Sequence, residues 1–276
     1  MQYSTIRNIS LKGKMARHLH ISNPQKPILV FIPGNLQEIE TIKDFNLGLS
    51  RYFDYHVVEL PGTGMTTPLH PSYDISYLAS CLEDFINNEL YSSSIHLVSC
   101  SYATGVALEY AKENSIKIDK LVLAGSMQDI PEEEWSQIFM MMSNCLHRPK
   151  EFSKGFLDLI TSESSTIPKH KVIKRATLRK AEKYTEDQFK CFIYNSIRLM
   201  SYKASQLETI TCPTMCFTGE LDPYVTPKRC KALADNIPNT TFRLIPNTDH
   251  LFHIEKPMET IDMICDYLLG KSPIAA

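Results

Sequence analysis

The chain has 276 residues, a length that suits one α/β domain with an insertion. Its 29 Lys and Arg residues nearly balance 31 Asp and Glu residues, and the formal charge of −2 excludes the strongly basic surface of a typical nucleic-acid-binding protein. The purest apolar run, Ile28 to Ile32, is far shorter than the roughly 18 residues that a membrane span requires, so we expect none.

The first ten residues, MQYSTIRNIS, are polar and charged where a secretory signal would be apolar, so we expect a cytoplasmic protein. The eight cysteines are scattered without a C-x-x-C pair, and several lie in apolar runs. This pattern predicts reduced, mostly buried thiols without disulfides or zinc. We expect no metal and no cofactor.

Short β-rich runs alternate with segments of helical period, which predicts βα units around a mostly parallel sheet, the α/β class. Residues 3–21 alternate around Lys12 and Gly13 as an antiparallel hairpin does. The apolar run ILVFI at 28–32 predicts a central strand that is buried on both faces. Further strands are expected at 56–60, 95–99, 120–124, 214–218 and 241–245, and helices at 38–53, 75–91, 102–113, 227–236 and 256–269.

The stretch 129–207 contains several amphipathic helical pieces and no convincing strand, which predicts a helical cap. The chain then divides into an α/β core at 1–128 and 208–276 and a cap at 129–207. Because the cap follows a strand, it should cover the C-terminal ends of the strands, where open α/β sheets bind ligands.

The first cap helix, expected at 132–146, follows Pro131 and contains a methionine-rich run. Such a run is most often simply packing, but unbranched methionine side chains also adapt to flexible ligands. We expect a mobile lid whose apolar side chains help to enclose an acyl chain: Phe139, Met140, Met141, Met142 and Phe156.

The segment 96–108, HLVSCSYATGVAL, is typical of a buried strand that runs directly into an amphipathic helix. Small residues at the junction indicate a nucleophile elbow, G-x-S-x-G, with Ser101 as the nucleophile and Ser99 and Ala103 in the glycine places. Taken alone the match is relaxed, because a serine before a helix is equally compatible with an N-cap.

A serine hydroxyl is a poor nucleophile until a base removes its proton and a carboxylate fixes the tautomer of that base. Asp222 lies in a turn after the strand expected at 214–218, and His250 lies in a loop after the last expected strand. The order Ser101, Asp222, His250 is that of a hydrolase triad.

Two alternatives to this triad stay open. His253 is a second histidine in the same segment, but it should lie on or near a first helical turn. Asp129 follows an earlier expected strand and could orient the histidine from there, although the turn around Asp222 is shorter and better defined.

Acyl transfer also needs backbone N–H donors for the oxyanion. We expect one from Tyr102, directly after the nucleophile, and one from Asn35 in the loop that follows the first buried strand. Gly34 would let that loop approach closely, although a plain strand-ending turn explains the same residues.

The chain resembles the α/β-hydrolase fold family over nearly its whole length. The matching segments are, in order, ILVFIPGN, HVVELPGTG, IHLVSCSYATGVALEYA, TMCFTGELDPYVTP and NTDHLFHIEKP. Departures are Pro33, where the family often has His, the two elbow substitutions, and Asp249, where the family often has Gly. More loosely, GELDPYVT and LVSCSY are similar to bacterial thioesterases, transacylases and hydroxyacyloxy-alkanoate synthases that use 3-hydroxyacyl-acyl-carrier-protein.

Triad and resemblance together predict a serine esterase, thioesterase or acyltransferase that forms a covalent acyl intermediate with a small-molecule acyl substrate. Residues 169–183 contain seven Lys and Arg against one acid, a patch that could dock an acyl carrier protein or coenzyme A, or could simply be a solvated helix face. Alternatives on the same fold are a non-catalytic ligand receptor and a carbon–carbon bond hydrolase or lyase.

Overall fold

The structure is a computed structural model that describes residues 5–90, 92 and 94–270. Within these residues, eight strands form one sheet in the order β1-β2-β4-β3-β5-β6-β7-β8. The strands are β1 (Arg7–Leu11), β2 (Lys14–Ile21), β3 (Ile28–Ile32), β4 (Asp54–Glu59), β5 (Ile95–Cys100), β6 (Ile118–Ala124), β7 (Thr214–Gly219) and β8 (Thr240–Ile245). β2 runs antiparallel to β1 and β4, and the pairings from β4 to β8 are parallel, which confirms the predicted α/β class.

The first two strands form the predicted hairpin. Lys12 and Gly13 connect them with φ of 49° and 74°, as a two-residue turn between twisted strands requires. Some sequence predictions lie outside the described residues: positions 3 and 4 of the hairpin, position 91 of a helix, and positions 1–4 and 271–276 of the core.

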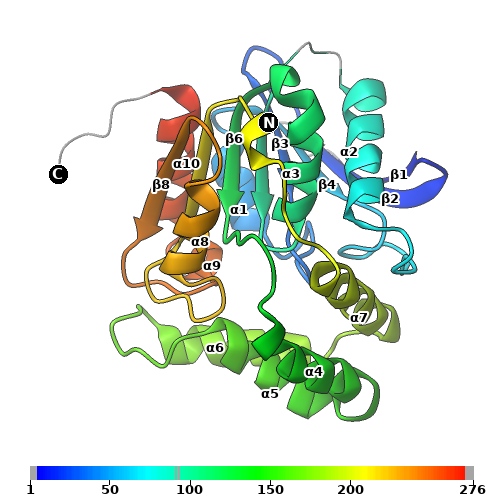
Figure 1. Ribbon diagram of the computed structural model, residues 1–276, viewed down its shortest axis with the longest axis vertical. Helices are drawn as coiled ribbons and strands as arrows, with labels where there is room; N and C mark the ends of the chain where they lie inside the picture. The colour runs from blue at the N-terminus through cyan, green and yellow to red at the C-terminus, as the bar shows by residue number, and fades with distance from the viewer. Residues whose placement is uncertain (1–4, 91, 93, 271–276) are drawn as a thin grey trace.

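Helices cover both faces of the sheet (Figure 1). α2 (Ile75–Glu89), α3 (Ala103–Asn114) and α8 (Pro227–Ala234) pack on one face, and α1 (Lys43–Leu49) and α10 (Pro257–Leu269) pack on the other. The strands β3, β5 and β7 are therefore buried on both sides, which explains the continuous apolar sequence ILVFI of β3.

The helix expected at 38–53 begins at Lys43, later than the sequence predicts. Residues 39–42 form turns rather than helix, because the Ile39 backbone bonds elsewhere: its N–H donates to Glu59, and its carbonyl accepts from the Asn46 side chain. Before α10, Lys256 has a φ of −135° and a ψ of 61°, a non-helical conformation, as expected because Pro257 disfavours helical geometry at the residue before it. A short helix, α9 (Phe252–Glu255), precedes that break.

Four helices lie between β6 and β7: α4 (Trp135–His147), α5 (Pro149–Ile160), α6 (His170–Ala181) and α7 (Glu186–Met200). They cover the C-terminal ends of the parallel strands, at the lower end of the view in Figure 1. Gln128 and Ala204 join the two connecting segments through two hydrogen bonds, at the neck of the insertion. The cap helices share an apolar cluster around Phe152 and Phe192, which also includes Leu36 from the loop after β3.

Among the described residues, no helix is both long enough and apolar enough to cross a membrane. The eight cysteines are all buried, as expected for small apolar side chains.

Candidate active site

Ser101 occupies a tight turn between β5 and α3. Its φ is 50°, a left-handed conformation that is costly for a residue with a side chain, and its N–H donates to the Ala124 carbonyl at 2.8 Å. A Cβ at Gly34 would lie 3.2 Å from the Ser101 Cβ, so only glycine lets the neighbouring loop approach this closely. The strained turn lifts the hydroxyl above the C-terminal edge of the sheet, as a nucleophile elbow does.

Ser101, His250 and Asp222 form a continuous hydrogen-bonded chain. His250 Nδ1 lies 2.6 Å from Asp222 Oδ2, and His250 Nε2 lies 3.0 Å from Ser101 Oγ. Since a carboxylate only accepts, Nδ1 carries the proton and donates to Asp222, which leaves the Nε2 lone pair facing the serine hydroxyl. This tautomer can remove a proton from Ser101.

The Asp222 carboxylate is buried yet fully hydrogen-bonded. Oδ1 accepts from the backbone N–H groups of Tyr224 and Val225, and Oδ2 accepts from the Thr218 hydroxyl at 2.8 Å. Burial lowers the pKa of His250, but the adjacent negative charge of Asp222 outweighs it, and the pKa of His250 lies above its usual value of 6.5.

Neither alternative triad residue has a comparable position. The Nε2 of His253 lies 3.2 Å from the Gln37 amide nitrogen, and burial, together with the charges of His250 and Lys180, lowers the pKa of His253 to about 3. Asp129 pairs with Lys203 at 3.3 Å and lies partly exposed. The geometry therefore favours His250 and Asp222.

The loop after β3 lies against the elbow. The Gly34 N–H donates to the Gln37 side chain at 2.7 Å, and Leu36 has a φ of 58°, so the loop turns tightly around Asn35. Asn195 of α7 donates both to Asn35 Oδ1 and to the Gly62 carbonyl, each at 3.0 Å. A cap residue thus fixes the loop that carries one predicted oxyanion donor.

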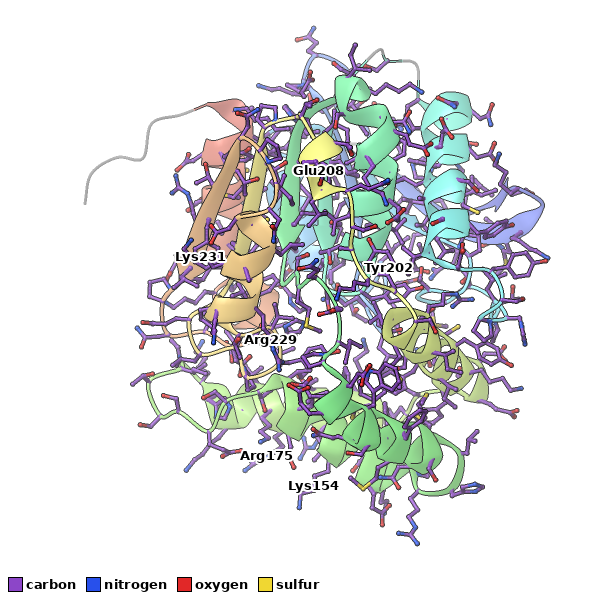
Figure 2. The ribbon with its side chains drawn as sticks, viewed as in Figure 1. Lys154, Arg175, Tyr202, Glu208, Arg229 and Lys231 are labelled. Atoms are coloured by element: carbon purple, nitrogen blue, oxygen red, sulfur yellow. The ribbon has the colours of Figure 1, made fainter. Side chains whose placement is uncertain are left out.

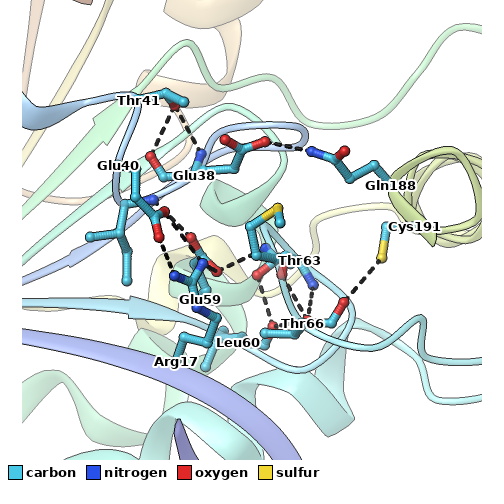
Figure 3. Close-up of polar contacts among 12 residues, drawn as sticks. Arg17, Glu38, Glu40, Thr41, Glu59, Leu60, Thr63, Thr66, Gln188 and Cys191 are labelled. Atoms are coloured by element: carbon cyan, nitrogen blue, oxygen red, sulfur yellow. Dashed lines mark hydrogen bonds and ion pairs between the residues drawn. The ribbon is translucent and has the colours of Figure 1, made fainter. Parts of the chain in front are cut away.

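Glu59 anchors the same loop from below (Figure 3). Its buried carboxylate accepts from the N–H groups of Ile39 at 2.7 Å and Met65 at 2.9 Å, and it pairs with Arg17 at 2.9 Å. A Cβ at Gly64 would lie 2.1 Å from this carboxylate, which explains the glycine in the PGTG turn. Two loops beside the site are thereby tied to one charged group.

A cavity of about 180 Å³ opens above Ser101, between the sheet and the cap. The triad serine and histidine, the loop residues Asn35 and Leu36, and Tyr102 line its floor. Its walls are mostly apolar and come from the cap: Ile130, Ile138, Met141, Phe156, Leu159, Ile160, Phe192 and Leu199. An apolar chain attached to a carbonyl at Ser101 fits this lining.

The methionine-rich run meets the cavity only in part. Met141 and Phe156 line it, whereas Phe139 and Met140 face solvent, 54% and 59% exposed. Met142 packs inside the cap cluster instead. This corrects the sequence prediction for those three residues, since successive residues of a helix point in directions about 100° apart and a run cannot all face one cavity.

The basic segment 169–183 is likewise divided between two surfaces. Arg175 and neighbouring Lys154 lie on the side of the cap that faces away from the sheet (Figure 2), where they border a shallow groove. Lys174 is neutralised by Asp158 at 3.0 Å and Glu163 at 2.5 Å. Lys180 points the other way: it lines the cavity, 3.7 Å from Glu38.

Several supporting residues have no signal in the sequence. Glu59 and Asn195 lie far along the chain from the loop they hold. Asp249 accepts from Ser162 N–H at 3.0 Å and from Leu251 N–H at 2.9 Å, and so ties the histidine loop to the cap. Gln37 acts within its own loop, where its side chain accepts from the Gly34 N–H three residues earlier.

A model of the family described as alpha/beta hydrolase fold matches residues 27–257. The chain belongs to the alpha/beta hydrolase fold family. The hydrolase class expected from the sequence is the class of this family. No curated protein matches the sequence.

Solved structures share this fold at low sequence identity. MGS-M2, an alpha/beta hydrolase enzyme from a Medee basin deep-sea metagenome library, is 15% identical with a TM-score of 0.84, covering 98% of this chain and 99% of its own. A thermophilic esterase from Thermogutta terrifontis is 18% identical with a TM-score of 0.81, covering 97% and 99%. The enol-lactonase from Burkholderia xenovorans LB400 is 14% identical with a TM-score of 0.82, covering 95% and 100%.

Proposed function

We propose that the protein is a serine hydrolase that cleaves carboxylic esters of medium-length acyl chains. The observation that carries this proposal is the unbroken Asp222–His250–Ser101 hydrogen-bonded chain, which ends at the floor of an apolar cavity. The esterase and enol-lactonase with the same fold act on ester bonds by name, which supports this bond type.

In the proposed reaction, Ser101 Oγ attacks the ester carbonyl while His250 Nε2 takes its proton. The carbonyl oxygen gains negative charge and is stabilised by the N–H groups of Tyr102 and Asn35. Imidazolium His250 then gives its proton to the departing alcohol as the acyl–oxygen bond breaks. A water, deprotonated by His250, releases the acyl group from Ser101 and restores the enzyme.

Turnover distinguishes this proposal from a ligand receptor on the same fold. A receptor would bind acyl compounds saturably without releasing an alcohol. Binding alone does not require the base His250 or the buried carboxylate of Asp222. Steady release of p-nitrophenol from p-nitrophenyl esters supports hydrolysis, and saturable binding without release contradicts it. Turnover of substrates with a cleavable carbon–carbon bond, without turnover of esters, would support the alternative of a carbon–carbon bond hydrolase or lyase.

The cavity sets an expected chain-length preference. Each methylene buried among its apolar walls contributes about 0.8 kcal/mol, so kcat/KM for p-nitrophenyl esters should rise about fourfold per methylene until the cavity is full. Phe156→Ala enlarges the cavity and should move the optimum to longer chains. Phe139→Ala, at an exposed position on the same cap, is the matched control and should leave the optimum unchanged. A flat profile, or the same shift in both variants, contradicts the assignment of the cavity.

An acyl thioester is a second proposed substrate, and the outer groove of the cap is the observation that favours it. Lys169, Lys171 and Arg175 border this groove, and the phosphates of coenzyme A or an acidic carrier protein would complement their charge.

Salt dependence tests the thioester proposal. Raising ionic strength should lower kcat/KM for acyl-coenzyme A while leaving that for a neutral ester unchanged, because only the first reaction uses exposed charges. Charge reversal at Lys171 and Arg175, which border the groove, should remove this difference. Lys174 is left intact because its reversal would break two ion pairs of the cap. If the salt dependence of kcat/KM for acyl-coenzyme A is the same before and after charge reversal, the groove does not bind the substrate and is only a solvated surface.

A further inference from the structure

A second cluster of polar side chains lies on the antiparallel edge of the sheet. His20 of β2 is directly opposite His56 of β4 in the register of the two strands. His18 and Asp54 are each two positions away along their own strands, so all four side chains point to one face. Phe85 of α2 packs against the His18 ring on this face, with the two ring centroids 4.9 Å apart.

The cluster is compact and its polar atoms converge. His20 Nε2 lies 2.8 Å from Asp54 Oδ1, and His56 Nε2 lies 3.8 Å from Asp54 Oδ2. One ligand atom from each of these residues lies within 4.8 Å of the other two, the one such group of three found in the part of the chain that the structure describes. The rings of His20 and His56 stack at 4.0 Å. A histidine pair with one carboxylate is a donor set that transition metals favour.

The surroundings supply what a metal-binding histidine needs. His56 Nδ1 lies 3.0 Å from His18 Nε2, so the nitrogen that faces away from Asp54 already has a hydrogen-bond partner. His20 is 35% exposed, which gives an ion access from solvent.

We propose that His20, Asp54 and His56 form a binding site for a divalent transition metal ion of the zinc type. In a tetrahedral zinc site, with ligands near 2.1 Å, neighbouring ligand atoms are about 3.4 Å apart. The three side chains reach this spacing through shifts of about an ångström. The two stacked rings cannot both point their lone pairs at one ion, so the half-exposed His20 must also rotate.

Metal binding would move protons along the histidine chain. His56 Nδ1–H would donate to His18 Nε2, and the His18 proton would then occupy Nδ1. In the structure without an ion, Arg7 Nη2 lies 3.2 Å from His18 Nδ1. Because a protonated Nδ1 no longer accepts, the exposed guanidinium would turn away from it. Arg7 retains an ion-pair partner in Glu89.

The site is remote from the proposed chemistry. Asp54 begins β4, whereas Ser101 follows the last residue of β5, at the opposite end of the parallel strands and about 20 Å away along the strand direction. The bound ion would therefore fasten the hairpin edge onto the sheet and take no part in ester cleavage.

Zinc binding by tag-free, chelator-treated protein tests the site. We expect isothermal titration with Zn²⁺ to show one ion per chain, and the melting temperature to rise by about 5–10 °C at zinc concentrations 100-fold above Kd. His20→Ala and Asp54→Asn should each weaken binding at least tenfold. Both changes suit the fold, since His20 is half-exposed and asparagine can still accept from the Asn23 N–H.

Two controls separate this site from others. His147→Ala changes an exposed histidine on the cap and should leave zinc affinity unchanged. His250→Ala removes the triad histidine and should also leave it unchanged. Absence of binding, binding that survives both His20→Ala and Asp54→Asn, or binding lost only in His250→Ala would overturn the proposal. These measurements need no substrate, so they stand apart from the outcome for ester hydrolysis.

Discussion

Replacing Ser101 by alanine is expected to lower kcat for a p-nitrophenyl ester by about 10⁴- to 10⁶-fold and to abolish covalent labelling by a fluorophosphonate probe. The reason is chemical: without Oγ no acyl-enzyme forms, and the remaining cavity and oxyanion donors accelerate only direct attack by water. Intact-mass spectrometry after labelling reports the adduct, and steady-state kinetics report the rate.

The chain offers a matched control two residues away. Ser99 is fully buried in β5 and its hydroxyl has no hydrogen-bond partner, so Ser99→Ala removes the same atom without touching the triad. This variant should keep both labelling and activity. Labelling that persists in Ser101→Ala, or that disappears in Ser99→Ala, would show that the nucleophile has been misassigned.

The second large effect concerns Asp222. Asp222→Asn should lower kcat by about 10⁴-fold near neutral pH, because an amide cannot hold the Nδ1–H tautomer that points the Nε2 lone pair at Ser101. Circular dichroism should show an unchanged fold, since asparagine can still accept from Tyr224 and Val225 through one oxygen.

The pH profile gives this prediction a second measurement. His250 must be neutral to accept a proton, and its pKa lies above 6.5, so kcat/KM of the wild type should fall as pH drops through a value above 6.5. In Asp222→Asn the charge that raises this pKa is gone, and the acid limb should move to lower pH. Asp129→Asn, at the alternative acid, should keep the wild-type profile. A limb that moves in Asp129→Asn instead would assign the acid role to Asp129.

The α/β class and the positions of the triad residues followed from local sequence patterns. The continuous apolar run ILVFI predicted a central strand, because only a strand covered on both faces dispenses with polar residues, and β3 lies between β4 and β5 in the sheet. Residues directly after parallel strands share one edge of the sheet, so a serine, an aspartate and a histidine in such places were expected to meet. The structure brings Ser101, Asp222 and His250 together there.

Only the tertiary structure decided which side chains surround this centre. A run of three methionines looks alike in sequence, yet the helix turns Met140 to solvent and Met141 to the cavity. The start of the first helix depended on Glu59, whose carboxylate, twenty residues along the chain, accepts a hydrogen bond from the Ile39 N–H. The histidine cluster depended on the register of two antiparallel strands, which brings His20 opposite His56 across 36 residues of sequence. Periodicity along the chain shows that a side chain is buried, whereas its partner is fixed by packing between segments, which no local pattern encodes.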